Sequence, residues 1–585
     1  MSIKLILKNI KQDVEEYKDY MIDFKEIVYE RPDMKHIESE FEKIQEHMPN
    51  AENVEQQLIY FQHIESIYSQ YLTANTLAYI RHSIDTTDEY YDQENNFFDE
   101  NNPTFQTWLN DFYQLLLKSE FRPELEEKLG KHFFDLLEVE AKTFSPEIVS
   151  DLIEENKLTT EYSKLVATAE VEFQGEKYTL AQLTAFREST DRKVRKAASE
   201  AYFGYYAEHE SELDRIYDEL VKVRTQIAKK LGYENFVELG YYRMSRTDYD
   251  AKDVKAFRDQ VCEEIVPIAT LLKERQRERL GLAEIKYYDE NFNFNSGNPK
   301  PLGDADWIVD NAKTMYEELS PETGEFFNFM LDYNLMDLLA KKSKEAGGYC
   351  AHLFDYKAPF IFANFNGTQG DIEVMTHEAG HAFQGYESKD IIPILYSSPT
   401  LEVAEIHSMS MEFFTWPWMD KFFGDQTEKF KFAHLAGTIE FIPYGVAVDE
   451  FQHYVYSNPT ASPEERKTKW RQIEKKYQPY LDFEDNDYLE RGGKWTRQLH
   501  IFTSPFYYID YTLAQVCAFQ FWLKDQVNHE SAWQDYLELC RAGGSKPFTE
   551  LLTIANLENP FEEGTIASVV PQIEEYLASV DDTKL

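Results

Sequence analysis

The 585-residue sequence has few of the residues that mark disulfide-linked, fibrous or membrane-spanning proteins. It contains only four cysteines and no Cys-x-x-Cys pair, so neither a disulfide framework nor a thiolate zinc site is expected. Glycine and proline are also sparse, at 23 and 21 residues, which excludes collagen-like and low-complexity chains. No stretch approaches about 18 consecutive apolar residues, so we expect no membrane-spanning helix.

Positive charge is scarce as well. The chain has 60 Lys and Arg against 106 Asp and Glu, a net charge of −46. Such a surface repels phosphate groups, so we expect neither a nucleic-acid partner nor an anionic membrane partner. One basic run, from Arg466 to Lys476, follows the helix-start signal Ser462-Pro463. We interpret this run as a solvated helix face.

The N-terminus shows no export signal. Residues 1–11 include several aliphatic side chains, but Lys4 and Lys8 interrupt them and no small-residue cleavage site follows. The cysteines are also far apart in the chain, at Cys262, Cys350, Cys517 and Cys540. A reducing, cytoplasmic location is therefore expected.

The hydrophobic pattern predicts a mainly α protein. Between residues 32 and 164, apolar residues recur at spacings of three and four, and Pro32, Pro103 and Pro146 stand at predicted turns or helix starts. Residues 171–178 alternate instead, which predicts a short β-hairpin.

A second non-helical region precedes the most informative part of the chain. The apolar run from Phe360 to Phe365 predicts a short strand. Asp371 is placed to cap the helix that follows, and Gly385 is predicted to end that helix.

This helix contains His377-Glu378-Ala379-Gly380-His381. The spacing of four puts both imidazoles on one face, where they can bind one tetrahedral Zn²⁺ ion. Glu378 is turned by about 100° from His377, so it can hold and deprotonate a water molecule on the metal. The motif is expected only about 0.06 times by chance; the alternative is two histidines that merely form hydrogen bonds. The helical glycine indicates close approach of another element.

Two histidines leave a catalytic zinc site one protein ligand short. The predicted helix at residues 401–412 offers Glu402, Glu405 and His407, and spacing alone does not choose among them. Glu405 and Glu412 share one helix face because they are seven residues apart. An ordinary acidic helix is the alternative reading.

The segments HEAGHAFQ, AEIHSMSMEFF, GGYC and PFIFANFNGT together resemble the thimet oligopeptidase/oligoendopeptidase F family of zinc metallopeptidases, in its oligoendopeptidase F branch. The resemblance covers residues 347–515. It implies that Glu405 completes the metal site and that Glu412 orients a ligand histidine.

The later segment HIFTSPFYYIDYTLAQ is similar to the family's His-plus-tyrosine segment. It implies that His500, Tyr508 and Tyr511 donate hydrogen bonds to the oxyanion of peptide hydrolysis. This segment is one residue shorter than in the thimet-like branch, which leaves Tyr507 as an alternative to Tyr508. Without the resemblance, these tyrosines are predicted to be core aromatics.

The resemblance also implies the fold: a large helical, clam-like body with a deep substrate channel and a small β-sheet beside the zinc helix. Residues 1–195 are expected to form an N-terminal helical domain that walls the channel, and residues 196–585 the catalytic domain. The strand is expected to offer an edge to an extended peptide, with Phe362, Ala363 and Asn364 binding the substrate.

The predicted function is that of a zinc-dependent oligoendopeptidase with one Zn²⁺ ion per chain. It would hydrolyse internal bonds of short unfolded peptides through a zinc-bound water activated by Glu378. The alternatives are a helical zinc carboxypeptidase and a non-catalytic peptide-binding scaffold. Short peptides are the expected partners of a monomer or weak homo-oligomer. Cys350 and His352 are candidates for lining the cleft; a buried thiol and an ordinary loop histidine are the alternatives.

Overall fold

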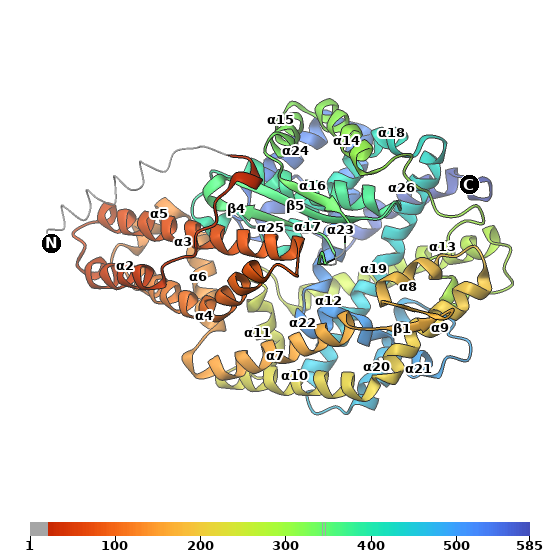
Figure 1. Ribbon diagram of the computed structural model, residues 1–585, viewed down its shortest axis with the longest axis horizontal. Helices are drawn as coiled ribbons and strands as arrows, with labels where there is room; N and C mark the ends of the chain where they lie inside the picture. Colours follow the sequence, from red (N-terminus) through yellow and green to blue (C-terminus); the bar gives the residue numbers. More distant parts are fainter. Residues whose placement is uncertain (1–21, 342, 346) are drawn as a thin grey trace. The chain divides into compact units, whose positions relative to one another are not determined.

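The computed structural model describes residues 22–341, 343–345 and 347–585. It confirms the mainly α fold, with two small sheets among many helices (Figure 1). Residues 1–11, where no export signal is expected, lie outside the described residues. In the described part of the chain, every helix is too short or too polar to cross a membrane.

The chain divides into two compact units, each built from three stretches. The first contains the described residues up to Ala141 with Pro301–Phe422 and Asn528–Asn556. The second contains Lys142–Lys300, Phe423–Val527 and Leu557–Leu585. This division differs from the sequential one at residue 195, which stays a prediction, as does the substrate channel.

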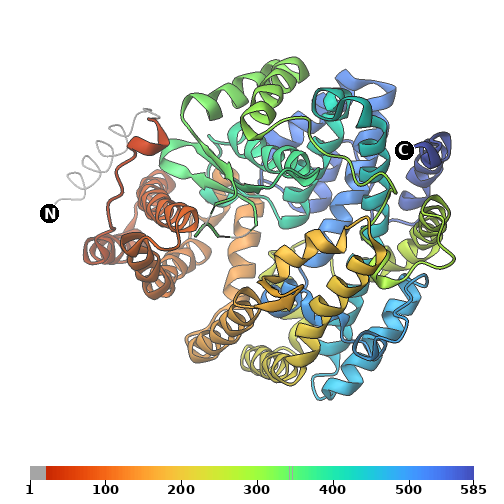
Figure 2. The same ribbon diagram turned by 45° about the vertical axis from the view of Figure 1, so that its right-hand side comes forward.

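The N-terminal helices of the first unit follow the predicted periodicity, and both views show them grouped together (Figures 1 and 2). They are α2 (Met34–His47), α3 (Val54–Ile84), α4 (Glu89–Leu117), α5 (Arg122–Leu129) and α6 (Lys131–Thr143). The predicted break at Pro103 is wrong, because this proline lies inside α4. Burial of Phe98 and Phe105 on either side of it favours a continuous helix over the hydrogen bond that proline removes.

A three-stranded sheet lies in the first unit, with strand order β3-β5-β4. Its strands are β3 (Met336–Leu339), β4 (Tyr349–Leu353) and β5 (Ala358–Phe365). The predicted strand is therefore confirmed as part of β5. On β5, Phe362 pairs with Asp337 of the parallel strand β3 and with Tyr349 of the antiparallel strand β4. The expectation that this strand offers an edge is wrong, since in the described sheet the edges are β3 and β4.

The three residues assigned to that edge have other surroundings. Phe362 and Ala363 are buried, and the Phe362 ring stacks on Tyr349 with centroids 4.7 Å apart. The Asn364 side-chain amide donates to the carbonyl oxygens of Glu345 and Gly347, both at 2.8 Å. All three therefore hold the central strand in place.

Helix α16 (Gly370–Glu387) packs against this sheet (Figure 1). The two predicted end signals are wrong. Asp371 lies in the first turn, where its carboxylate accepts the backbone N–H groups of Asn366 at 2.9 Å and Gly367 at 2.8 Å. Gly385 lies inside the helix. A Cβ added to it would lie 1.7 Å from Nε2 of His352 on β4, so a larger residue would not fit at this position. The glycine serves close packing of the helix against the strand.

The second unit is built mainly of helices, and the predicted hairpin is confirmed as β1 (Val171–Phe173) paired antiparallel with β2 (Glu176–Tyr178). Its main helices are α7 (Val149–Ala167), α8 (Leu180–Arg187), α9 (Arg192–Glu208), α10 (Glu210–Lys230), α11 (Phe236–Arg243), α12 (Ala251–Gln260), α13 (Val266–Arg279), α19 (Thr427–Ser457), α20 (Pro463–Tyr477), α22 (Leu499–Thr503), α23 (Tyr508–Val527) and α26 (Thr565–Ser579).

The basic run lies on α20, which begins with the expected capping box at Ser462. A fully solvated face is wrong, because Arg466, Lys467 and Arg471 are buried. Each is paired with a carboxylate, as Arg466 is with Asp218 at 2.9 Å. The sequence periodicity indicates that this helix has a buried face. The run of Lys and Arg residues does not by itself reveal that some of these side chains lie on that face.

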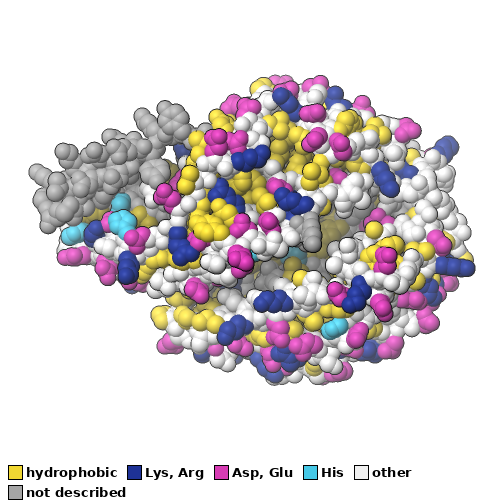
Figure 3. Space-filling view, viewed as in Figure 1, with side chains coloured by type: hydrophobic (Ala, Val, Ile, Leu, Met, Phe, Trp, Pro, Cys, Tyr) yellow, Lys and Arg dark blue, Asp and Glu magenta, His cyan; other side chains and the backbone are white. Residues whose placement is uncertain are grey.

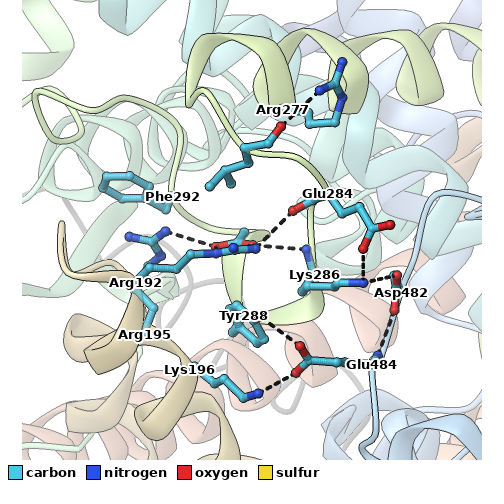
Figure 4. A network of polar contacts seen from close by, with 12 residues as sticks. Arg192, Arg195, Lys196, Arg277, Glu284, Lys286, Tyr288, Phe292, Asp482 and Glu484 are labelled. Atoms are coloured by element: carbon cyan, nitrogen blue, oxygen red, sulfur yellow. Dashed lines mark hydrogen bonds and ion pairs between the residues drawn. The ribbon is translucent and has the colours of Figure 1, made fainter.

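A polar network holds the loop after α13 (Figure 4). Arg192 and Arg195, both on α9, bond to the buried carboxylate of Asp289 at 2.6 Å and 3.0 Å. Lys286 bonds to Asp482 at 2.6 Å. The loop is thereby anchored to two other segments of the second unit. On the outer surface, acidic side chains are spread over the visible face with Lys and Arg among them (Figure 3).

Candidate metal centre and active site

Helix α16 presents His377 and His381 on one face, with ring centroids 5.0 Å apart. Helix α17 (Leu401–Phe414) packs against it. At the contact, a Cβ added to Gly380 would lie 2.6 Å from the carbonyl oxygen of His407. The prediction that this glycine marks close approach of another element is confirmed.

The approach of α17 brings Glu405 beside both histidines. Its Oε2 lies 3.2 Å from His377 Nε2 and 3.6 Å from His381 Nε2. Donor atoms of the three residues all lie within 4.8 Å of one another. Ser408 Oγ donates to the same carboxylate oxygen at 2.9 Å, which fixes its position. Two imidazole nitrogens and a carboxylate oxygen form a donor set that suits Zn²⁺.

The other two ligand candidates lie on the same helix but outside this group. Glu402 and His407 are fully buried. Burial lowers the pKa of His407 to about 3, so the ring is neutral. Its backbone carbonyl accepts a hydrogen bond from Tyr536 at 2.8 Å. The packing of α17 thus places Glu405, but neither Glu402 nor His407, within reach of a metal ion held by the two histidines. Spacing in the sequence alone could not make this distinction.

Glu412 lies behind the first histidine. Its Oε1 is 2.7 Å from Nδ1 of His377, and this bond leaves Nε2 directed at Glu405. Burial lowers the pKa of His377, but the two carboxylates outweigh it and raise the pKa well above its usual value. Burial raises the pKa of Glu405, but the two histidines and Ser408 lower it to about 2.

Glu378 is buried beside this group. Burial raises the pKa of its carboxyl group to about 7, with the negative charges of Glu405 and Glu412 adding to the shift and His377 opposing it. A Cβ added to Gly348, just before β4, would lie 3.6 Å from Glu378 Oε1. The carboxyl group therefore lies against the start of β4, with a pKa suited to proton exchange near neutral pH.

Strand β4 carries the two weaker candidates. Burial raises the pKa of the Cys350 thiol, and the charge of Glu378 adds to this effect. Burial lowers the pKa of His352 to about 4. The loop assignment for His352 is wrong, since it lies on the strand. Both side chains belong to the strand that packs on α16.

The predicted oxyanion donors lie in the second unit. His500 is on α22, and the ring centroids of Tyr508 and Tyr511 lie 5.0 Å and 5.8 Å from its own. The Tyr511 hydroxyl donates to the Tyr507 hydroxyl at 2.9 Å. Burial raises the pKa of Tyr508, which keeps its phenol protonated. The structure brings these four side chains together.

Two further residues of this cluster were not predicted from the sequence. Tyr444 donates to Oε1 of Gln498 at 2.8 Å, and the Gln498 amide nitrogen lies 3.0 Å from Nδ1 of His500. Because an amide nitrogen only donates, the proton of the neutral ring is placed on Nε2. Gln498 stands two positions from His500, a local signal that could have been used. Tyr444 lies far away in the sequence and carries no such signal.

Comparison with known proteins identifies related enzymes. Residues 24–144 match the peptidase M3 N-terminal domain, and residues 185–301 and 314–570 match peptidase family M3. A solved structure of PZ peptidase A with an inhibitor is 58% identical, with a TM-score of 0.92, and the match covers 96% of this chain and 100% of that one.

More distant relatives agree. The oligoendopeptidase F homolog of Borreliella burgdorferi is 22% identical over 83% of this chain and 79% of its own length. The chromosomal oligoendopeptidase F of Lactococcus lactis subsp. cremoris is 22% identical over 61% of this chain, which spans 59% of that relative. The chain therefore belongs to peptidase family M3, in its oligoendopeptidase F branch, and is a metalloendopeptidase.

Proposed function

We propose that this protein is a zinc-dependent oligoendopeptidase that hydrolyses internal bonds of short, unfolded peptides. The observation that carries the proposal is the convergence of His377, His381 and Glu405, with Glu378 beside them. These three residues would hold one Zn²⁺ ion. When bound, the ion supplies a Lewis acid that polarises the scissile carbonyl and lowers the pKa of a water molecule.

Glu378 is the proton carrier in this proposal. Its carboxylate accepts a proton from the attacking water and returns it to the leaving amine. Burial supports this role, because it raises the pKa of the Glu378 carboxyl group and so favours proton uptake. Glu412 holds the ring of His377 in position through the 2.7 Å hydrogen bond.

His500, Tyr508 and Tyr511 are the proposed donors to the oxyanion. The proposal rests on the family resemblance and on their grouping within the second unit. The contact between Gln498 and Nδ1 supports it, since it orients the ring and places the proton of the neutral form on Nε2.

An extended peptide is proposed to pair with the edge of β4. This strand is unpaired on one side within the described sheet, and its start lies beside Glu378. Main-chain pairing recognises extended peptides of many sequences and rejects folded chains. The four cysteines are free thiols, which supports a reducing, cytoplasmic location.

Digestion of a peptide-length ladder, with and without a chelator, tests this function. Products identified by mass should show internal cleavage of short peptides, including peptides blocked at both ends, and none with the chelator. Release of single residues from free C-termini alone would indicate a carboxypeptidase instead. Unchanged cleavage after verified metal removal would contradict the zinc proposal.

A further inference from the structure

Arg497 stands out in a protein with a net charge of −46. It ends the short helix η10 (Lys494–Arg497) in the second unit. Its Nε is buried without a hydrogen-bond partner, and no described residue forms an ion pair with its guanidinium group. Its close contact is instead the Tyr444 ring, whose centroid lies 5.5 Å from the guanidinium carbon.

A second arginine lies near it. Arg187, at the end of α8, is buried, and its guanidinium carbon lies 4.6 Å from the centroid of the Tyr202 ring. Its Nε donates to Ser199 Oγ at 3.3 Å, and no carboxylate group of a described residue forms an ion pair with it. Burial lowers the pKa of Arg187, and the positive charge of Arg497 lowers it further. The two guanidinium groups are therefore close enough to repel each other.

The carboxylate in this neighbourhood is already engaged. Glu290 lies 3.3 Å from the ammonium group of Lys494. Both arginines act on Glu290 electrostatically, but neither forms an ion pair with it. Two cations thus remain with no anion of their own, which is costly in a partly buried place unless a ligand supplies the negative charge.

From this arrangement we infer that Arg497, assisted by Arg187, binds the C-terminal carboxylate of a peptide substrate. A guanidinium group binds a carboxylate with two parallel hydrogen bonds, which suits this ligand better than it suits a neutral amide. The inference deepens the proposed peptidase function and rests on it for the identity of the ligand.

The geometry of the second unit also sets a distance. The Arg497 guanidinium carbon lies 5.5 Å from the Tyr444 ring centroid, which lies 5.8 Å from that of Tyr508. An extended peptide advances about 3.3 Å per residue. Because the two distances set only an upper limit, a chain end on Arg497 would stand at most about three to four residues beyond a bond held at Tyr508. Cleavage is expected close to the C-terminus of short peptides.

The test compares three forms of one short N-acetylated peptide: the free acid, the C-terminal amide, and the amide with Glu as its last residue. Dissociation constants are measured with the full-length Glu378→Gln protein, which is expected to bind peptides without cleaving them. Values of kcat/KM are measured with the unsubstituted enzyme, which retains Glu378. The amide should bind about ten- to a hundredfold more weakly than the acid. Introducing Arg497→Gln should remove this difference by weakening acid binding alone.

Two further variants serve as checks. Arg497→Lys keeps the positive charge but cannot form the two parallel hydrogen bonds of a guanidinium group, so it should retain only part of the preference for the acid. The control Arg491→Gln alters an exposed arginine of the same unit that already pairs with Glu210, and should retain all of it. Equal binding of acid and amide, or equal weakening of both by Arg497→Gln in protein with a normal melting temperature, would overturn the inference.

The remaining outcomes separate the two claims. Tight binding of the Glu-ended amide would assign the site to side-chain carboxylates and overturn the C-terminal assignment. If the acid binds better but the zinc-loaded Glu378 enzyme cleaves no peptide, the carboxylate site stands and the proposed function fails. If peptides are cleaved without preference for the acid, the carboxylate site fails and the proposed function stands.

Discussion

His377 Nδ1 and Glu412 Oε1 form a 2.7 Å hydrogen bond between α16 and α17. The bond fixes the ring so that its other nitrogen points at Glu405. A carboxylate in this position also makes the imidazole a better donor to a metal.

We expect Glu412→Gln to weaken zinc binding by about 10- to 100-fold, because the amide orients the ring less strongly and supplies no charge. Competition with a chromogenic chelator measures this. The control is Glu387→Gln at the end of α16, the helix that carries His377, where Glu387 pairs with Arg541 at 2.8 Å. Equal zinc affinity in the two variants would contradict the role of Glu412.

Replacing Glu378 with Gln removes the proton carrier but none of the three proposed ligands. Turnover should fall by at least about 100- to 10,000-fold while zinc content stays near one ion per chain. Steady-state cleavage of a fluorogenic peptide and elemental analysis of the same sample check both halves. Near-normal cleavage would remove Glu378 from its proposed role.

Gly380→Ala would place a methyl group 2.6 Å from two backbone atoms of α17, at His407 and Ser408. Backbone cannot move aside as a flexible side chain can, so the variant should lose about 1–3 kcal/mol of unfolding free energy and much of its zinc affinity. Gly437→Ala is the matched control, since Gly437 lies in α19 with nothing within 4 Å of an added Cβ. It should gain about 0.5–1 kcal/mol. Denaturant unfolding distinguishes the two outcomes.

Gln498→Met should lower kcat by about tenfold or more without changing zinc content, because His500 loses the partner that positions its Nε2 proton. Tyr444→Phe should act in the same direction but less strongly, since it removes only the bond that orients Gln498. Both variants should leave the melting temperature nearly unchanged. A rise in KM at constant kcat would indicate a role in substrate binding instead.

The buried carboxyl group of Glu65, which accepts a hydrogen bond from the Ile394 backbone at 2.6 Å, should make stability depend on pH. Burial raises its pKa from 4.5 to about 7. Between these values the unfolded chain releases a proton that the folded protein retains, so stability falls as pH rises through this window.

Glu65→Gln removes this loss and should raise the unfolding free energy by about 1–3 kcal/mol at pH values above the window, with little effect below it. Melting temperatures on both sides of the window measure the difference. The exposed Glu55 on the same helix supplies the control, because Glu55→Gln should give no such dependence. A pH-independent effect of Glu65→Gln would contradict the argument.

Local features of the sequence predicted the helices, the hairpin, the strand at residues 360–365 and the paired histidines, because each depends on residues a few positions apart. The same reasoning failed where a distant segment intervenes. Gly385 looked like a helix end, but it is the place where α16 meets His352 of β4. Pro103 looked like a break, but burial on both sides carries the helix through it.

The spacing of His377 and His381 is a property of one helix, so the sequence by itself determined it. The tertiary structure alone shows that Glu405, and not Glu402 or His407, lies beside the two histidines, that β5 is the central strand, and that Arg497 has no carboxylate partner among the described residues. The physical reason is that each depends on how separate helices and strands pack, and packing depends on side-chain volumes and on which polar groups are buried together.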